Sequence, residues 1–275
     1  MPSVAELDTP AVTVRLDIMD SNIARVHGHL ARHGIANRPH IKTHKIPALG
    51  NRQMAAGAVG ITCQKLGEVE VFTDAGVADD VLLTFNVIGR AKTERLAALT
   101  RRLRRLAVVF DNEVVARGLS EAAREHRIEI PFLVECDTGF GRNGVQTPEA
   151  AFELARAAMK LPGLRFEGLM TFPNREPTTR MFLEQALELF KRSGIPVPVV
   201  SGSARPRSSR RSTCPCSPST APEPTSTTTA WWSLPVPRPG TTARCAYVPP
   251  SSAARPPTAR SSTAAPRCSP RTSTP

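Results

Sequence analysis

Residues 38–45, RPHIKTHK, place guanidinium, imidazole and amine groups in one short segment. In a β-strand every second side chain shares a face, so Lys42 would lie with His40 on one side, opposite Ile41. With Ile41 packed against a helical layer, Lys42 would point into the protein. A lysine held partly out of water beside other cations is suited to forming Schiff bases with aldehydes. The other interpretation is a solvated basic edge, the usual environment of clustered Lys and Arg. The shared face would carry Arg38, His40, Lys42 and His44.

Alternating strand-like and helix-like segments surround this stretch. A helix is predicted from Asp17, as its N-cap, to Gly34, because Met19, Ile23 and Leu30 fall on one stripe. Short apolar runs then predict strands at 39–44, 58–64, 79–87, 106–111, 130–137, 166–172 and 195–200. Helical patterns separate them at 67–76, 91–106, 113–126, 148–160 and 179–194.

Repeated strand-then-helix order with short connections is typical of a parallel sheet with helical crossovers. Six or seven such units predict an α/β fold, an incomplete (β/α)8 TIM-like barrel, over residues 1–202. A doubly wound open sheet is the alternative. In a barrel, Lys42 would lie near the end that carries catalytic groups.

Residues 203–275 have a different composition. They hold 15 of the 26 prolines, no Ile, no Phe and a single Leu, so they cannot bury enough apolar surface to offset the entropy of ordering. We expect a disordered tail rich in Pro, Ser, Thr and Arg. Suitable codons for residues 219–232, read one base later, encode a peptide with strand and loop character. We therefore hypothesise that this segment is read out of frame.

Charge and cysteine content narrow the class of protein. The chain carries +12, of which +9 belongs to residues 203–275 and only +3 to residues 1–202. The tail lacks lysine and interleaved aromatics, which argues against a nucleic-acid-binding protein. Apolar runs stay well short of the roughly 20 residues of a membrane span. Two cysteines in residues 1–202 and no visible signal peptide favour a reduced, cytoplasmic setting.

Several motifs together resemble a known family. DTPAVTVRLDIMDSNI followed by RPHIKTHK resembles the fold-type III pyridoxal-phosphate enzymes with an alanine-racemase-like N-terminal barrel. Within that group it is most similar to D-threonine aldolase, 3-hydroxy-D-aspartate aldolase and D-serine dehydratase. The resemblance covers roughly residues 8–202 and implies that Lys42 bonds covalently to pyridoxal 5′-phosphate.

Three further motifs carry residues that the resemblance places at the cofactor. GITCQKLGEVEVF implies that Gln64 touches it, although a buried amide bonded to backbone would look the same. VECDTGFGRNGV implies that Arg142 lies beside it, where a guanidinium supplies permanent positive charge. VPVVSG resembles the start of a phosphate cradle, of which Ser201 and Gly202 are present. His40 is a candidate proton shuttle, a phosphate partner or a structural histidine. GLMTFP has Phe172 where relatives often have tyrosine.

The resemblance also implies parts that this chain lacks. Relatives complete the site with a C-terminal β-domain whose histidine, with a cysteine or aspartate, binds a divalent metal. Residues 203–275 contain no histidine and do not resemble that domain. We therefore expect no metal ligands here, and the homodimer expected of the intact family is not expected of this chain.

We therefore predict the enzyme family of the chain and the catalytic activity of these 275 residues separately. By lineage the chain is a pyridoxal-phosphate-dependent lyase acting on D-β-hydroxy amino acids, and these 275 residues are expected to show little or no activity. An amino-acid racemase or a small pyridoxal-phosphate carrier is the first alternative. A racemase needs a second base, usually a tyrosine, and the region predicted to fold contains none.

Overall fold

The computed structural model describes residues 6–175, 177–203 and 230–235. Its helices are α1 (Leu16–Arg32), α2 (Pro47–Ala55), α3 (Leu66–Asp74), α4 (Arg90–Thr100), α5 (Glu113–His126), α6 (Pro148–Ala158) and α7 (Thr178–Arg192). Its strands are β1 (Ala36–Pro39), β2 (Ile61–Cys63), β3 (Asp80–Leu83), β4 (Arg105–Phe110), β5 (Ile130–Cys136), β6 (Leu164–Thr171), β7 (Val199–Ser203) and β8 (Ala230–Pro235). The predicted α/β alternation is confirmed.

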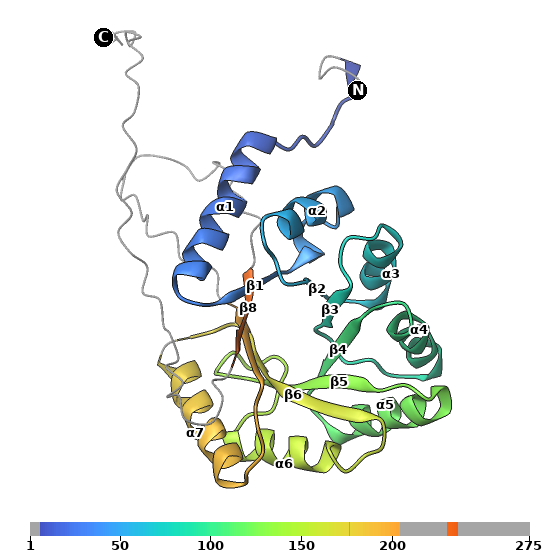
Figure 1. Cartoon of the computed structure of the whole chain (residues 1–275), viewed down its shortest axis with the longest axis vertical. Coiled ribbons are helices and arrows are strands. Elements are labelled where there is room, and N and C mark those ends of the chain that lie inside the picture. The colour runs from blue at the N-terminus through green and yellow to red at the C-terminus, as the bar shows by residue number, and fades with distance from the viewer. Residues whose placement is uncertain (1–5, 176, 204–229, 236–275) are drawn as a thin grey trace, which may run out of the picture.

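The strands form one sheet in the order β1-β8-β7-β6-β5-β4-β3-β2, curled with its helices outside (Figure 1). Strands β2 to β7 pair in parallel, each with its sequence neighbour. A single parallel bridge between His40 and Thr62 links β1 to β2. The described residues thus form an incomplete TIM-like barrel with six complete strand–helix units, as predicted.

The eighth position of the barrel departs from the β/α pattern. Strand β8 lies between β7 and β1 and is antiparallel to both, so within the described residues this place is not filled by a parallel strand with a crossover helix. The prediction of a disordered, out-of-frame tail at 203–275 falls almost entirely outside the described residues. Within that range only Ser203, at the end of β7, and β8 are described.

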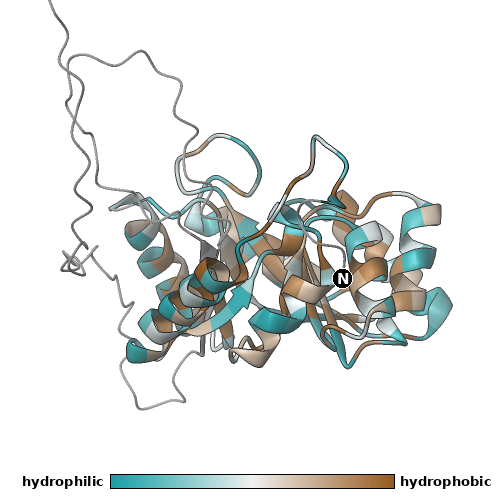
Figure 2. Cartoon of the chain, turned by 90° about the horizontal axis from the view of Figure 1, so that it is seen from above, coloured by the Kyte–Doolittle hydropathy of each residue, from teal (hydrophilic) through white to brown (hydrophobic). Residues whose placement is uncertain are grey.

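Strand periodicity divides the buried residues into two layers. One set of strand side chains packs against the helices in a large core that includes the stacked rings of Phe110 and Phe132. The alternate side chains fill the barrel interior, where Leu82, Val109 and Met170 pack together. Figure 2 shows the outward sides of the helices coloured as hydrophilic. None of the described helices is long and apolar enough to span a membrane.

Helix ends follow local sequence signals in several places. Asn112 caps α5 by accepting a hydrogen bond from Val115 N at 3.1 Å. Gly34 follows α1 with φ of +66°, as expected for a helix stop. The predicted cap of α1 was wrong, because Asp17 lies inside its first turn and pairs instead with Arg15.

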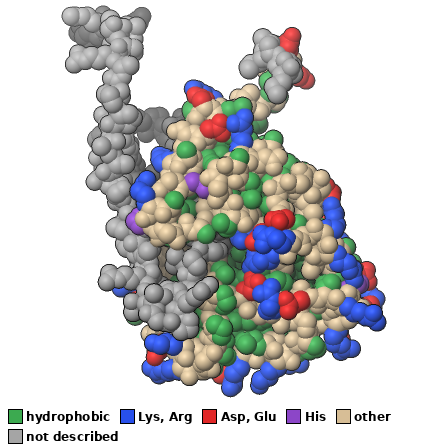
Figure 3. Space-filling view, viewed as in Figure 1, with side chains coloured by type: hydrophobic (Ala, Val, Ile, Leu, Met, Phe, Trp, Pro, Cys, Tyr) green, Lys and Arg blue, Asp and Glu red, His purple; other side chains and the backbone are tan. Residues whose placement is uncertain are grey.

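The helix predicted over residues 91–106 was wrong at its C-terminal end. Helix α4 ends at Thr100 and Arg105 begins β4, with its side chain only 17% exposed. Arg102 does lie at the surface and pairs with Asp74 of α3. Figure 3 shows Lys and Arg side chains beside acidic ones along this side of the molecule.

A β-bulge lies in β6 where its register with β5 shifts after Phe132. Gly168 sits there with φ of +151°, and a Cβ on it would fall 1.8 Å from Val199 O of β7. Only glycine therefore allows β6 and β7 to approach this closely.

We expect Gly168→Ala to destabilise the fold by about 2 to 3 kcal/mol, because it adds backbone strain and overpacks the β6–β7 contact. Gly118→Ala is the matched control, since a Cβ on this α5 residue meets nothing within 4 Å. It should stabilise by up to about 1 kcal/mol through helix propensity. Urea unfolding of both variants measures the difference, and equal effects would contradict the packing argument.

Candidate active site

Lys42 lies just beyond the end of β1, at the carboxyl end of the barrel strands. The chain leaves β1 at Pro39 and enters a 3₁₀-helix, Ile41–Thr43, whose N-cap is His40. The prediction of a strand through residue 44 was therefore wrong, and with it the shared face of Arg38, His40, Lys42 and His44. His44 instead turns away, with its Nε2 3.3 Å from Gln53 Oε1.

The inward direction expected of Lys42 is nevertheless observed. Its Nζ donates a hydrogen bond of 3.0 Å to Oε1 of Gln64, which follows β2. Gln64 is held in turn by its Nε2, which donates to Thr84 O at 3.3 Å, and by its backbone N–H, which donates to Glu68 Oε2 at 2.7 Å. Lys42 and Gln64, both predicted to lie at the cofactor, are thus neighbours, and two further hydrogen bonds hold Gln64 in place.

His40 is 1% exposed and lies beneath Lys42. Its Nδ1 accepts a hydrogen bond from the backbone N–H of Lys42 at 3.3 Å. Burial, together with the charge of Lys42, lowers the pKa of His40 to about 3. The imidazole is therefore neutral at neutral pH, which favours a positioning role over the predicted proton shuttle. Another histidine, His27 of α1, is half-buried with its Nε2 2.7 Å from Asn37 Nδ2.

The loop after β5 is organised by Asp137. Its carboxylate accepts hydrogen bonds from four successive backbone N–H groups, those of residues 139–142, at 2.7 to 3.1 Å. Burial alone would raise the pKa of Asp137, but the hydrogen bonds from Phe140 and its neighbours outweigh it and hold that pKa below its usual value. This anchored turn fixes the backbone from which Arg142 projects.

Arg142 and Lys42 come together on one aromatic ring. The guanidinium carbon of Arg142 lies 4.8 Å from the centroid of Phe172, and Lys42 Nζ lies 5.5 Å from the same centroid. Cation–π contacts of this length are attractive. The ring of Phe172 thus contacts both cations of the candidate site.

Ser201 and Gly202 end β7 on the same side of the barrel. Ser201 is fully buried, and its Oγ finds no hydrogen-bond partner among the described residues. Gly202 lies so close to Asn174 that a Cβ would fall 2.5 Å from Asn174 Nδ2. A buried hydroxyl without a partner among the described residues, next to a glycine that leaves room for the Asn174 amide, fits the start of an anion cradle. The rest of the predicted cradle lies outside the described residues.

Glu135 is a site residue that motif comparison did not find. It occupies β5 two residues before Asp137, is 2% exposed, and its Oε2 has no partner within the described part of the chain. Burial first, and then the negative charge of Asp111, raises the pKa of Glu135 to about 7. A charged residue at an inward position of an otherwise apolar strand was the available signal.

Residues 14–204 match the family described as alanine racemase, N-terminal domain. The chain belongs to this family. The matched residues include most of the described barrel. Among the described residues of this alanine racemase N-terminal domain, no group of three His, Cys, Asp or Glu side chains could hold a metal ion.

Characterised relatives share the domain. A 3-hydroxy-D-aspartate aldolase of Paracoccus denitrificans is 36% identical over 173 residues, which are 62% of this chain and 44% of that protein. A D-threonine aldolase of an Arthrobacter species is 37% identical over 169 residues, 62% of this chain and 44% of that protein. The chain thus spans about half the length of the curated relatives it matches.

Solved structures agree. The crystal structure of D-threonine aldolase from Filomicrobium marinum superposes with a TM-score of 0.69 at 35% identity, covering 73% of this chain and 57% of that one. An alanine racemase of Clostridium difficile reaches a TM-score of 0.58 at 16% identity, over 70% of this chain and 56% of that one, and shows the shared fold alone.

Proposed function

We propose that this chain is the cofactor-binding part of a pyridoxal-phosphate-dependent lyase that acts on D-β-hydroxy amino acids. The observation that carries the proposal is the convergence of Lys42, Gln64 and Arg142, from three separate elements, at the carboxyl end of the barrel strands. This end is where barrel enzymes place their chemistry. The aldolase and dehydratase names of the relatives support the substrate class.

Each residue has a role that follows from its chemistry. Pyridoxal phosphate, when bound, supplies an aldehyde that condenses with amines and a ring that takes up electrons. Lys42 would hold it covalently, with Gln64 orienting the amine through the 3.0 Å hydrogen bond. Arg142 would add a permanent positive charge beside the site. Ser201, with its unpartnered hydroxyl, would receive the phosphate.

Several expectations from the sequence lie outside this proposal. Low activity of these 275 residues stays a prediction. A homodimer, a cytoplasmic location, the absence of nucleic-acid binding, and the domain limits at 1–202 and 203–275 stay predictions. No observation favours the racemase or the carrier over the lyase, since the racemase likeness concerns the fold.

Trapping of the cofactor tests the proposal directly. The protein would be incubated with pyridoxal phosphate, reduced with borohydride, digested and mapped by mass spectrometry. We expect the reduced cofactor on Lys42, because Gln64 holds this amine inside the barrel mouth. Lys45 provides the internal comparison, since it is three residues away with its side chain 56% exposed. Equal labelling of the two lysines, or labelling spread over the surface, would contradict the proposal.

A further inference from the structure

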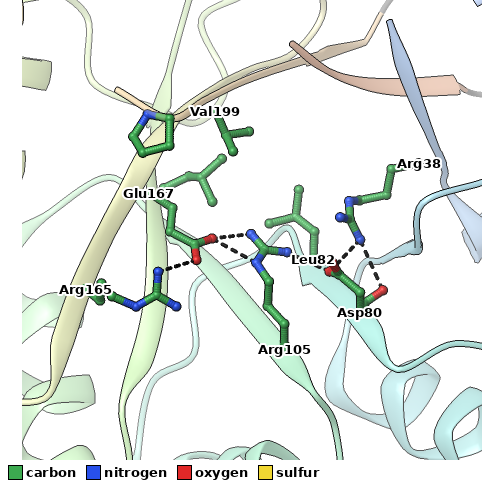
Figure 4. A pocket seen from close by; sticks show the side chains of 9 residues that line it. Arg38, Asp80, Leu82, Arg105, Arg165, Glu167 and Val199 are labelled. Atoms are coloured by element: carbon green, nitrogen blue, oxygen red, sulfur yellow. Dashed lines mark hydrogen bonds and ion pairs between the residues drawn. The ribbon is translucent and has the colours of Figure 1, made fainter. Parts of the chain in front are cut away.

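A cavity of about 250 Å³ lies at the floor of the barrel, the end away from Lys42 (Figure 4). Asp80 and Arg105 begin β3 and β4, so the cavity is at the amino end of the parallel strands. The charged side chains that line it are Arg38, Asp80, Arg105, Arg165 and Glu167. Its volume equals that of about eight water molecules, which is enough for a small organic ligand.

The carboxylates of the cavity already have their donors. Each oxygen of Asp80 and of Glu167 accepts a hydrogen bond from an arginine. Arg38 and Arg105 even share Oδ1 of Asp80, at 2.8 and 2.7 Å. These acceptors have little capacity left, so a ligand of the cavity must bring acceptors of its own.

Arg38 keeps donors that no described residue accepts. Its Nη1 donates to Asp80, to the backbone oxygen at 3.1 Å and to Oδ1 at 2.8 Å. The Nε–H and both N–H groups of Nη2 have no acceptor in the described part of the chain, although the side chain is only 7% exposed. Nε–H and one N–H of Nη2 form a parallel fork, the arrangement that binds a carboxylate through two hydrogen bonds.

The charge of Arg38 is less well compensated than that of Arg105. Burial lowers the pKa of Arg38 below its ordinary value, although the charge of Asp80 opposes this. At Arg105 the hydrogen bonds and charges of Glu167 and Asp80 outweigh burial, so its pKa is raised. A further negative charge beside Arg38 would therefore stabilise this buried cation.

Part of the cavity lining is apolar. Leu82, Leu133 and Val199 line it, and the two leucines belong to the cluster of the barrel interior against which Val199 packs. We call these three side chains the apolar wall. An inorganic anion gains nothing from them, whereas an aliphatic chain placed there is removed from water.

We propose that the floor cavity binds a small aliphatic carboxylate. Its oxygens accept hydrogen bonds from Nε and Nη2 of Arg38, and its carbon chain packs against the apolar wall. The site lies at the opposite end of the barrel from Lys42, so it does not depend on the proposed function. Because only the folded chain forms the cavity, the ligand also stabilises the fold.

Sodium butyrate is the probe, added to the full chain, and binding is followed by NMR saturation transfer from the protein to the butyrate methyl group. We expect saturable binding, and binding about tenfold weaker in Arg38→Lys, which keeps the charge but loses the fork. Val199→Phe fills the cavity without removing an ion pair and should weaken binding at least as much. Acetate, shorter by two CH₂ groups, should also bind about tenfold more weakly.

Arg104→Met and Arg142→Met are the controls. Arg104 is 61% exposed and pairs with Asp80 without lining the cavity, and Arg142 lies at the other end of the barrel. Both variants should bind butyrate as the unaltered protein does, and circular dichroism checks that every variant is folded. The proposal is overturned if the unaltered protein shows no saturable binding, if Arg142→Met abolishes it, or if Arg38→Lys or Val199→Phe retains full affinity. Equal affinities for acetate and butyrate would exclude the apolar wall from the site and overturn it as well.

Discussion

Lys42→Ala is expected to abolish covalent retention of pyridoxal phosphate while leaving the protein folded. The substitution removes the amine that Gln64 orients inside the barrel mouth, and Lys42 is only partly buried, so little packing is lost. The visible absorption of lysine-bound cofactor should disappear together with the borohydride-trapped peptide. We expect a complete loss of covalent cofactor binding, because without the Lys42 amine the bond to the cofactor aldehyde cannot form.

Lys45→Ala is the matched control for this experiment. Lys45 lies in the same segment, and its Nζ is 3.6 Å from Glu68 Oε1, so it shares the neighbourhood without facing the barrel mouth. Its replacement should leave the absorption and the trapped Lys42 peptide in place. Unchanged absorption in Lys42→Ala, or its loss in both variants, would assign the bond to another amine.

Arg105→Met is expected to reduce the free energy of unfolding by about 3 kcal/mol, because it leaves buried carboxylates short of a partner. Arg105 lies at the floor of the barrel, opposite the candidate site, and bonds both Asp80 of β3 and Glu167 of β6 (Figure 4). Asp80 also pairs with Arg38 of β1 at 2.8 Å, and Glu167 with Arg165 at 2.7 Å. The network therefore connects β1 to β3 and β4 to β6, strands that do not pair with each other.

The same floor holds a cavity of about 250 Å³ lined by these charges and by Leu82, Leu133, Pro198 and Val199. Arg38 reaches the cavity across Gly60, where a Cβ would fall 2.1 Å from Arg38 Nη1. After Arg105→Met, Asp80 still pairs with Arg38 and Glu167 still pairs with Arg165. The expected loss of unfolding free energy is therefore at the lower end of the range for breaking a buried ion pair.

Arg104→Met controls for the loss of an arginine at this place in the chain. Arg104 also pairs with Asp80, at 3.4 Å, but its side chain is 61% exposed, against 17% for Arg105. A solvent-exposed pair contributes at most about 1 kcal/mol, so this variant should unfold at nearly the original urea concentration. Similar losses of unfolding free energy in Arg105→Met and Arg104→Met would show that the burial of Arg105 does not determine how much its ion pairs stabilise the fold.

Much of the fold was predictable because it rests on local periodicity. Runs of apolar residues bounded by helical patterns located the six strands, β2 to β7, that pair in parallel, and the alternation implied parallel pairing with outer helices. The candidate cofactor residues were predicted through motifs that resemble those of a known family, as in RPHIKTHK around Lys42. The structure places Lys42 beside Gln64, and it places both Lys42 and Arg142 against the ring of Phe172.

Local sequence by itself determined which residues are apolar, which segments turn and which amine the motif predicts to be reactive. Only the tertiary structure decided that Lys42 reaches the interior from a 3₁₀-helix, that Arg105 is buried at the floor, and that Glu135 is buried on β5. The physical reason is that a charged side chain's environment depends on partners far along the chain. Arg105 and Glu167 are 62 residues apart, and only sheet register and barrel curvature bring them together.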